Sequence, residues 1–520
     1  MPADSFCSIE PLENDIVAAI NAMNVESSCG PDEIPAKLIK NIMCYLVLPL
    51  KIIFQKSFQT GIVPEAWRQG IIVPIYKNNR KPHEAASYRP VCLTSVVAKL
   101  AERVLMSYMT PFFLANNIIA RNQHAFIAKR STSTNLLECL NDWTEAVDRN
   151  KPIDILYLDL QKAFDSVPHA KLIYKLKKAG IGGNILKWLE SFICCRKHCV
   201  RVNFAKSPFE PVESGIAQGT LSGPMLFIMY LNDITELELS STMKLYADDA
   251  KVYRIVKEED HSRLLQSDIE NVSLYLSNWQ LTINDSKSEI IHLGNINQNF
   301  QYSIGQTNLV AKNNCRDLGI KISDDQKFSH HVNDIVRTAY YRLKQQRISF
   351  TCKDVDFQLH MYTTYIRPVL ESNTVIWSPY LLKDIDKIEG VQRLFTRQLP
   401  GFETLPYPDR LQRLNLKSLE ERRIIFDLLF VYKIIHGLVD IDFDDFFVYN
   451  SNNTRGHRYK LRVQYSRINY RKSFFSNRII PVWNNLSSEI VEHKSLESFK
   501  KGIQALNFTI FCRGHALTTQ

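Results

Sequence analysis

The sequence predicts an α+β fold in which a small antiparallel sheet is backed by helices. An almost uninterrupted apolar run, Asp154–Leu160, is typical of a buried strand, and two β-prone runs flank Asp248-Asp249 as in a hairpin. A long amphipathic pattern over Glu258–Trp279 predicts a helix directly after that hairpin. The order strand, helices, strand, helix, hairpin, helix and strand therefore gives one small sheet covered by helices.

Length and composition set the number of domains. With 520 residues the chain is too long for one ordinary core, so about two to four domains are expected. We expect a helical extension over residues 1–60, the sheet-containing region over 61–320 and a helical region over 321–520. The eleven cysteines form no repeated Cys-x-x-Cys framework. The formal net charge of +10 permits a polyanionic partner without proving one.

No segment has the pattern of a secretion signal or a membrane anchor. The first residues, MPADSFCSIEPLEND, are acidic and lack an apolar core. No apolar run approaches the ~18 residues of a membrane span. We therefore expect a soluble intracellular protein, in the cytoplasm, the nucleus or both, with no membrane partner; the sequence leaves its oligomeric state open.

The N-terminal part combines helices with a basic loop. Helical spacing is seen in Glu13–Met23 and in a mostly apolar pair of helices over Ile34–Phe58, around Pro49. After a short strand, Lys77 and Arg89 flank one loop. Two cations so placed suit a triphosphate ligand, and they equally suit an ordinary solvated loop.

The strongest chemical signal is a set of carboxylates at strand ends. Asp159 follows the apolar run and Asp248-Asp249 lie at the hairpin tip, so that neighbouring strands could bring Asp159 and Asp248 together. Adjacent carboxylates repel and are costly to bury unless a cation lies between them. An isolated Asp-Asp pair is usually a solvated turn, but the apolar flanks here favour an all-oxygen Mg²⁺ site of the kind used in two-metal phosphoryl transfer.

A glycine-rich loop, Ser214–Pro224, lies between the strand and the hairpin. Its glycines would let the backbone approach a ligand closely. The loop lacks the glycine pattern and the Gly-Lys-Ser/Thr ending of a Walker loop, which argues against an NTPase of that kind.

From Lys327 onward the sequence predicts amphipathic helices with basic faces. The predicted helices are His330–Gln346, Asp354–Leu370, Lys383–Leu399 and Leu416–Ile435. The arginines assigned to their exposed faces are Arg393, Arg397, Arg410, Arg413, Arg422 and Arg423. Farther on, residues 455–478 interleave cations with aromatic rings, which suits a phosphate backbone with stackable bases and also a solvated basic face over an aromatic core.

Taken in order, these segments resemble the reverse transcriptase of LINE-type (non-LTR) retrotransposons, in particular the jockey-like group. The resemblance extends from about Gly30 to Lys500, and its central motifs are Leu158–His169, Ser214–Phe227 and Tyr246–Asp249. The other matching segments are Gly30–Asp32, Gly61–Pro64 with Trp67, Tyr88–Pro90, Leu93–Ser95, Lys99–Arg103, Trp279 with Asn284 and Lys287, Asp317–Ile320, Arg367–Glu371, Trp377–Tyr380 and Glu389–Arg393. A Tyr-x-Asp-Asp motif alone would be weak, whereas this ordered set is specific.

The resemblance implies a right-hand polymerase with fingers, a palm containing the small antiparallel sheet and a helical thumb, extended by N-terminal helices and a basic C-terminal region. It implies that Asp159, Asp248 and Asp249 are catalytic and hold two Mg²⁺ ions, with the carbonyl of Leu160 as an extra ligand and Mn²⁺ as an alternative metal. The implied partners are an RNA template, a DNA primer and dNTPs.

The resemblance also assigns residues to the substrates. Those implied to contact the incoming nucleotide are Lys77, Arg89, Phe164, Gln218, Gly219 and Lys287. Phe164 stands where the family places a ring that would clash with a ribonucleotide 2′-hydroxyl, or it is an ordinary core residue; Lys287 is a general acid for pyrophosphate or a plain surface lysine. The arginines expected to bind template and primer are Arg393, Arg397, Arg458, Arg462, Arg467 and Arg471.

Two motifs depart from the family pattern. Ala217-Gln218-Gly219 replaces Pro-Gln-Gly, and Ala125-Phe126 replaces Gly-Phe after the segment containing Gln123. Both changes affect backbone shape more than chemistry. The family's endonuclease and its cysteine-histidine knuckle are not found in this sequence, so we expect a fragment or a truncated copy, and target nicking is not assigned to it.

The predicted function is RNA-directed DNA synthesis from a primer 3′-hydroxyl by two-metal phosphoryl transfer. One alternative is a retroelement relic that binds RNA without polymerising; the intact carboxylates count against it, and the altered motif counts for it. Another is an intron-maturase-like or telomerase-like polymerase, against which the segments Trp377–Tyr380 and Glu389–Arg393 argue.

Overall fold

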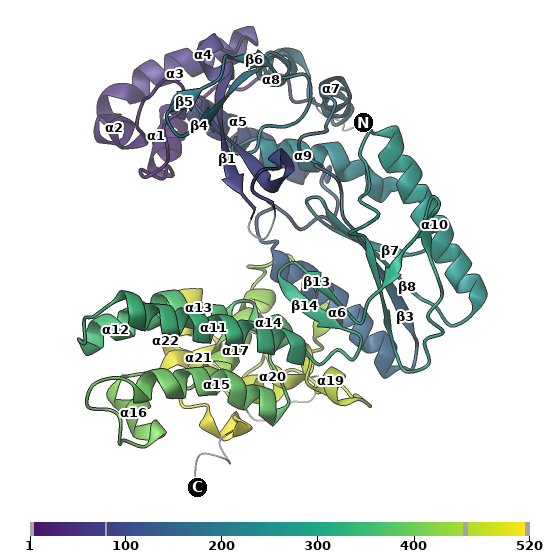
Figure 1. Ribbon diagram of the computed structural model, residues 1–520, viewed down its shortest axis with the longest axis vertical. Coiled ribbons are helices and arrows are strands. Elements are labelled where there is room, and N and C mark those ends of the chain that lie inside the picture. The colour runs from purple at the N-terminus through teal and green to yellow at the C-terminus, as the bar shows by residue number, and fades with distance from the viewer. Residues whose placement is uncertain (1–4, 78–80, 451–455, 515–520) are drawn as a thin grey trace.

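The computed structural model describes residues 5–77, 81–450 and 456–514. Figure 1 shows the N-terminal helices at the top, a sheet beside the long helix α10 at the right, and the helices of the last third of the chain at the bottom. The protein is thus a mixed helix-and-sheet structure, in agreement with the predicted class.

The N-terminal region is built on a five-stranded sheet. In it β1 is antiparallel to β2 and parallel to β4, in the order β2-β1-β4-β5 with β6 also on β4. The strands are β1 (Gln69–Tyr76), β2 (Tyr88–Thr94), β4 (Lys197–Val202), β5 (Ala205–Lys206) and β6 (Glu210–Pro211). The helices of this region are α1 (Glu13–Asn21), α2 (Ala36–Asn41), α3 (Met43–Thr60), α4 (Glu65–Arg68), α5 (Val96–Ala115) and α8 (Gly183–Cys194).

The division of the first helices differs from the prediction. We expected two helices around Pro49, but the chain breaks at Ile42, and α3 continues through Pro49. A proline inside a helix removes one backbone hydrogen bond. Here Leu50, Phe54 and Phe58 follow at four-residue spacing and are all buried, so packing holds the helix together past the proline.

A second five-stranded sheet lies at the centre of the molecule, in the order β12-β9-β3-β8-β7. Its strands are β3 (Ile153–Leu158), β7 (Thr242–Tyr246), β8 (Asp249–Ile255), β9 (Glu289–Leu293) and β12 (Val310–Ala311). All neighbouring pairs are antiparallel except β12 with β9. The antiparallel sheet and its hairpin are therefore as predicted, with β3 in the middle.

The central sheet separates two hydrophobic cores. Side chains alternate along a strand, so Leu156 and Leu158 of β3 join one core while Ile153 and Ile155 join the other. The first core includes helices α7 (His169–Lys178), α9 (Gly223–Leu231) and α10 (Glu259–Asn278). The second includes α6 (Thr132–Asp148) and the C-terminal helices, so both faces of the sheet are covered.

Two small hairpins lie beside the end of the sheet-containing part, and most of the described residues after them are in helices. The hairpins are β10 (Ser303–Ile304) with β11 (Thr307–Asn308), and β13 (Asn314–Asp317) with β14 (Ile320–Ser323). The helices are α11 (Ser329–Ser349), α12 (Val355–Met361), α13 (Arg367–Glu371), α14 (Thr374–Trp377), α15 (Leu382–Arg397), α16 (Tyr407–Arg413), α17 (Leu419–Ile435), α18 (Phe443–Phe446), α19 (Asn469–Lys472), α20 (Phe475–Asn484), α21 (Ser488–Val491) and α22 (Leu496–Ala505). Within the ranges that the structure describes, none of the helices combines the length and the apolarity needed to span a bilayer.

Candidate active site

The central sheet brings two of the predicted carboxylates to the same end. Asp159 directly follows β3, and Asp248 lies in the turn between β7 and β8. Because β3 and β8 are paired neighbours, with Leu158 opposite Ala250, the residues that extend beyond this register lie beside each other. The buried strand and the hairpin predicted from sequence are what position both side chains.

A cleft of 990 Å³ opens over these carboxylates. Its lining contains Asp159, Leu160 and Asp248 together with every residue predicted to contact a nucleotide: Lys77, Arg89, Phe164, Gln218, Gly219 and Lys287. These residues come from the first sheet, the end of β3, the glycine-rich loop, the turn between β7 and β8 and the segment before β9. Asp249 does not line the cleft; the residue as a whole is exposed, but its carboxyl group, beside Asp248, has lost part of its contact with water.

Asp159 is held by neighbours from the segment before β9. Lys287 Nζ and Asn284 Nδ2 both donate to Asp159 Oδ2, each at 2.9 Å. The backbone is fixed as well, because Asp159 N–H donates to Ser288 Oγ at 3.3 Å and its carbonyl accepts from the N–H of Asn284 at 2.7 Å. The Asp159 carboxylate thus has a fixed orientation and a cation next to it.

The carboxylates of the hairpin repel one another and have lost part of their contact with water. Loss of water contact, together with the nearby charge of Asp159, raises the pKa of Asp248 above its ordinary value. The same loss of water, followed by the charge of Asp248, raises the pKa of Asp249 to about 6. A bound cation would relieve this repulsion, which is the condition under which neighbouring carboxylates favour metal binding.

The metal fit rests on a pair of carboxylates rather than on three. Across residues 5–77, 81–450 and 456–514 the structure has no group of three or more His, Cys, Asp or Glu side chains arranged to hold a metal. Mg²⁺ commonly uses one or two protein carboxylates and takes its other ligands from water and substrate phosphates. Asp159 and Asp248, facing one cleft, fit that requirement, whereas Asp249, whose charge interacts with both, does not line the cleft.

The glycine-rich loop packs tightly on its supports. Gly219 has φ +115°, and a Cβ there would lie 2.6 Å from the carbonyl oxygen of Cys92 in β2, so this position requires glycine. The N–H of Cys92 in turn donates to the Gln218 carbonyl at 2.7 Å. Gln218 Nε2 donates to Asp165 Oδ1 at 3.0 Å, a contact that fixes the amide at the wall of the cleft.

Phe164 belongs both to the core and to the cleft. Its ring stacks on Phe227 of α9 at 4.3 Å between centroids and 17° between planes. It is half-buried, packs against the first core and also lines the cleft. The two interpretations left open by the sequence are therefore compatible, since one face packs inward while the ring still borders the cleft.

Lys77 and Arg89 lie together at the end of the first sheet. The register of β1 with β2 pairs Arg89 with Ile75, and Lys77, two residues after Ile75, shares that face. Arg89 is exposed, and Lys77 Nζ donates to the carbonyl of Ala86 at 3.5 Å. The expected loop between them includes residues 78–80, which lie outside the described residues.

Sequence reasoning missed the residues that support these side chains. Ser288 and Asp165 hold Asp159 and Gln218, but their contacts join positions 129 and 53 residues apart. Nothing in the local sequence of either residue signals such a contact, because a hydrogen bond across the fold depends on register and packing.

The basic residues of the C-terminal region do not form one exposed surface. Arg397, Arg458, Arg462 and Arg467 are exposed. Arg471 is buried, and its guanidinium donates to Asn141 Oδ1 and Thr144 Oγ1 of α6, each at 2.9 Å. A buried guanidinium held in this way cannot reach a phosphate backbone, so the structure corrects the inclusion of Arg471.

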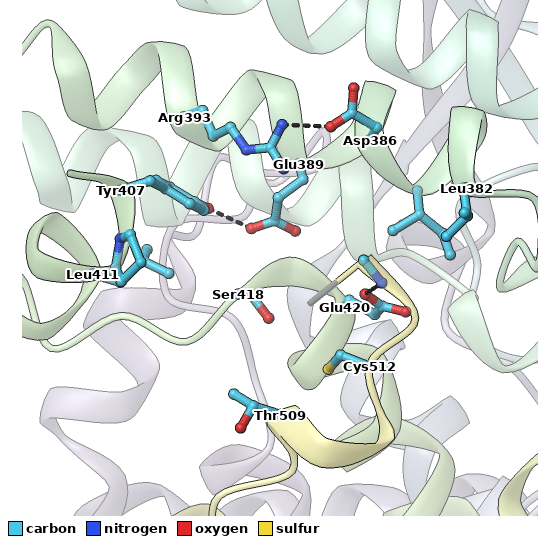
Figure 2. Close-up of a pocket in the computed structure, with 13 residues that line it drawn as sticks. Leu382, Asp386, Glu389, Arg393, Tyr407, Leu411, Ser418, Glu420, Thr509 and Cys512 are labelled. Atoms are coloured by element: carbon cyan, nitrogen blue, oxygen red, sulfur yellow. Dashed lines mark hydrogen bonds and ion pairs between the residues drawn. The ribbon is translucent and has the colours of Figure 1, made fainter. Parts of the chain in front are cut away.

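Two further arginines that the helical pattern assigned to exposed faces, Arg410 and Arg423, are buried in the structure. Figure 2 shows Arg393 beside a cavity of 150 Å³, where it is paired with Asp386, while Tyr407 donates to Glu389. Residue 455 of the basic segment lies outside the described residues.

Comparison with known proteins agrees with the motif order. A family model described as reverse transcriptase (RNA-dependent DNA polymerase) matches residues 75–322. The chain is 27% identical over 417 residues to the probable RNA-directed DNA polymerase from transposon X-element of Drosophila melanogaster, covering 78% of this chain and 45% of that protein. It is 24% identical over 414 residues to the RNA-directed DNA polymerase from mobile element jockey of the same species, covering 76% and 44%.

A further Drosophila melanogaster relative, the probable RNA-directed DNA polymerase from transposon BS, is 24% identical over 450 residues, covering 81% of this chain and 48% of the relative. The chain therefore spans less than half the length of the curated relatives it matches. The resemblance predicted from the motifs is confirmed: residues 75–322 match the reverse transcriptase family, and most of the chain is similar to the RNA-directed DNA polymerases of jockey-like non-LTR retrotransposons.

Proposed function

We propose that this chain is an RNA-directed DNA polymerase that extends a primer 3′-hydroxyl with dNTPs on an RNA template. One observation carries the proposal: Asp159 and Asp248 share a single cleft with the residues predicted to contact the nucleotide. These residues lie far apart in the sequence, and a fold that brings them together supports a common task. Fingers and palm over residues 61–320 and a thumb with a basic extension over 321–520 belong to the same proposal.

Asp159 and Asp248 would hold Mg²⁺, with the Leu160 carbonyl as a further oxygen at the cleft wall and Asp249 next to the site. The chemistry that bound Mg²⁺ would supply is a lower pKa of the primer 3′-hydroxyl and neutralisation of charge on the leaving pyrophosphate. Lys287 Nζ, 2.9 Å from Asp159 Oδ2, keeps that carboxylate oriented before substrate enters.

The other residues of the cleft bind and orient the nucleotide. Lys77 and Arg89 face the cleft from the first sheet, where their charges would attract the triphosphate. Gln218 and Gly219 present a backbone held close to β2, which leaves room for the nucleotide base and the template. Phe164 would border the sugar, where a ring supported by Phe227 would obstruct a 2′-hydroxyl.

The template and primer would continue along the basic C-terminal region. The candidates for backbone contacts are the exposed arginines Arg397, Arg458, Arg462 and Arg467, with Arg393 at the margin because it is already paired with Asp386. Such contacts attract nucleic acid without reading its sequence.

Primer extension on an RNA template with Mg²⁺ and dNTPs tests the proposal. We expect extension by the wild-type chain and a loss of more than ~100-fold in Asp248→Ala and Asp159→Asn, since even residues behind a metal ligand contribute 10–100-fold. Asp260→Asn, an exposed carboxylate on α10, serves as the matched control and should leave the rate unchanged. A folded wild-type chain that binds template–primer without extending it would favour the RNA-binding relic instead.

A further inference from the structure

We propose that Gln123 is a positioning residue for the catalytic turn, acting through the backbone N–H of Ala247. Gln123 does not line the cleft and is fully buried. Its side-chain oxygen Oε1 accepts a hydrogen bond from Ala247 N–H at 3.0 Å, and Ala247 immediately precedes Asp248. This inference rests on the proposed function, because it assigns Gln123 a part in holding the carboxylate of that site.

The turn that carries Asp248 needs such support. Tyr246 pairs with Asp249, so Ala247 and Asp248 alone form the turn between β7 and β8. Ala247 has φ +57°, in the left-handed region that residues with a Cβ seldom adopt. Glycine is the usual residue for such a position in a tight hairpin. An alanine there is kept in place by its surroundings rather than by its own preference.

Residues 122–124 run along the edge strand β7 and hold the start of this turn. The N–H of Leu245 donates to the Asn122 carbonyl at 2.9 Å, and the N–H of His124 donates to the Leu245 carbonyl at 3.1 Å. Gln123 thereby pairs with the end of β7, the edge strand, where the turn begins. The backbone contacts fix Leu245, and the Gln123 side chain reaches two residues further, to Ala247.

Only the oxygen of the Gln123 amide is used. Besides Ala247, it accepts from the N–H of Ala125 at 3.0 Å, so one atom holds two separate segments. The amide nitrogen has no hydrogen-bond partner within the part of the chain that the structure describes. If the oxygen were removed, two buried N–H groups would be left unsatisfied, and the strained peptide of Ala247 would be free to rotate.

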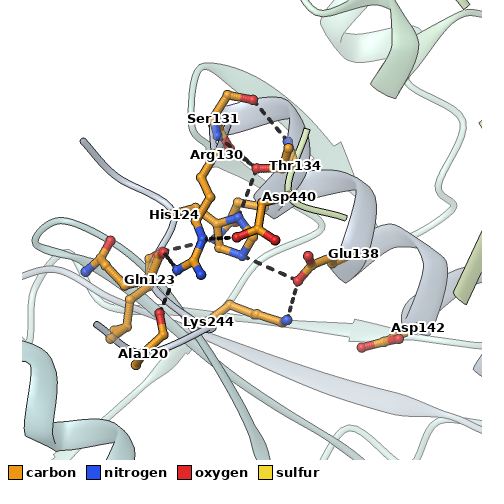
Figure 3. Close-up of polar contacts among 12 residues, drawn as sticks. Ala120, Gln123, His124, Arg130, Ser131, Thr134, Glu138, Asp142, Lys244 and Asp440 are labelled. Atoms are coloured by element: carbon orange, nitrogen blue, oxygen red, sulfur yellow. Dashed lines mark hydrogen bonds and ion pairs between the residues drawn. The ribbon is translucent and has the colours of Figure 1, made fainter. Parts of the chain in front are cut away.

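The backbone of Gln123 is itself held by Arg130, as Figure 3 shows. Arg130 Nη1 donates to the carbonyls of Ala120 and Gln123, each at 2.7 Å, and its Nε donates to Asp440 Oδ2 at 2.7 Å. Asp440 follows α17, so the support for the turn extends into the C-terminal region. Because Arg130 fixes the backbone of Gln123, the Gln123 side chain extends from a fixed position when it reaches Ala247.

The test compares Gln123→Leu, which removes the acceptor at similar volume, with Gln123→Glu, which keeps it. We expect Gln123→Leu to lower kcat by about 10- to 100-fold, because small displacements of catalytic groups have effects of that size. The KM for dNTP and the Kd for template–primer should change less than about threefold, because Gln123 touches neither. Gln123→Glu should stay within about tenfold of wild type. Gln346→Leu, a buried glutamine of α11 that contacts Gln358, is the matched control.

Hydrogen exchange of a peptide covering residues 243–250 gives a readout independent of activity. Amides of this peptide should exchange faster in Gln123→Leu and as in wild type in Gln123→Glu and Gln346→Leu. Equal kcat and equal exchange in wild type and folded Gln123→Leu would overturn the inference while leaving the polymerase in place. If Gln123→Leu does not fold, slow extension together with fast exchange in folded Gln123→Glu would overturn it. No extension by wild-type protein would overturn the proposed function and this inference with it.

Discussion

The three carboxylates that we propose to be catalytic, Asp159, Asp248 and Asp249, have different environments. Asp159 has a lysine and an amide on one oxygen, whereas burial and mutual repulsion raise the pKa values of Asp248 and Asp249. A carboxyl whose folded pKa lies above its unfolded value binds protons more readily when folded. Its contribution to stability is therefore largest at low pH and falls as the pH rises through about 6.

Mg²⁺ should reverse this dependence. The metal competes with protons for the carboxylates, so we expect saturating Mg²⁺ to raise the unfolding temperature little near pH 5 and clearly above pH 6, by the equivalent of about 2–3 kcal/mol at 100-fold excess over Kd. Thermal unfolding with and without Mg²⁺ across this range measures the effect. Asp248→Asn should remove most of it; an equal Mg²⁺ effect at both ends of the range would contradict the prediction.

At the level of elements, a buried ion pair joins the β13–β14 hairpin to the central sheet. Lys251 Nζ on β8 lies 2.6 Å from Asp317 Oδ2 at the end of β13, and the side chains are only 2% and 3% exposed. Burial alone would lower the pKa of Lys251, but the charge of Asp317 outweighs it and raises that pKa. The hairpin, which resembles the family's primer-grip segment, is thereby fixed two residues from Asp249.

Removing only one charge of the Lys251–Asp317 pair should destabilise the fold more per residue than removing both charges together. Asp317→Leu leaves the Lys251 charge buried, and we expect it to lower the free energy of unfolding by about 3–5 kcal/mol. Lys251→Met with Asp317→Leu should cost clearly less than the sum of the single changes, because neither charge is then left unpaired. Chemical denaturation of the four proteins measures this, and additive losses would show that the two charges do not interact.

At the scale of the whole molecule, the central sheet joins the candidate site to the C-terminal helices. One face of β3 packs on the core that contains α9 and α10, and the other on the core shared by α6 and the C-terminal helices. Arg471 belongs to that second junction, where it bonds to α6, while Arg462 and Arg467 remain exposed nearby in the sequence. Arginines of one basic segment thus have different tasks.

These tasks can be separated by salt dependence. Arg462→Ala and Arg467→Ala should weaken template–primer binding and each reduce the slope of log K against log salt by about 1, with no change in unfolding temperature. Arg471→Ala should instead lower the unfolding temperature, because it leaves buried polar groups on α6 without partners. Binding titrations at several salt concentrations, paired with thermal unfolding, distinguish the two; a change in salt slope for Arg471→Ala alone would contradict this division.

The sequence by itself determined the central strand, the acidic hairpin and the long helix after it. Their patterns are local: an almost uninterrupted apolar run in β3, a turn pair between two β-prone runs, and helical spacing in α10. The motif order likewise predicted the similarity to RNA-directed DNA polymerases and the residues that line the cleft. Ala125, which stands where the family has glycine, is not in the left-handed backbone conformation, which Phe126 adopts instead.

Only the tertiary structure decided which of these residues share a site and what holds them. In the tertiary structure Asp249 does not line the cleft, and the side chain of Gln123 accepts a hydrogen bond from Ala247 N–H. The buried arginines are Arg410, Arg423 and Arg471. A helical pattern tells which residues share a face, but it does not tell which neighbour covers that face. Contacts between segments more than a hundred residues apart, such as Gln123 with Ala247, depend on sheet register and packing, and they leave no signature in the sequence around either residue.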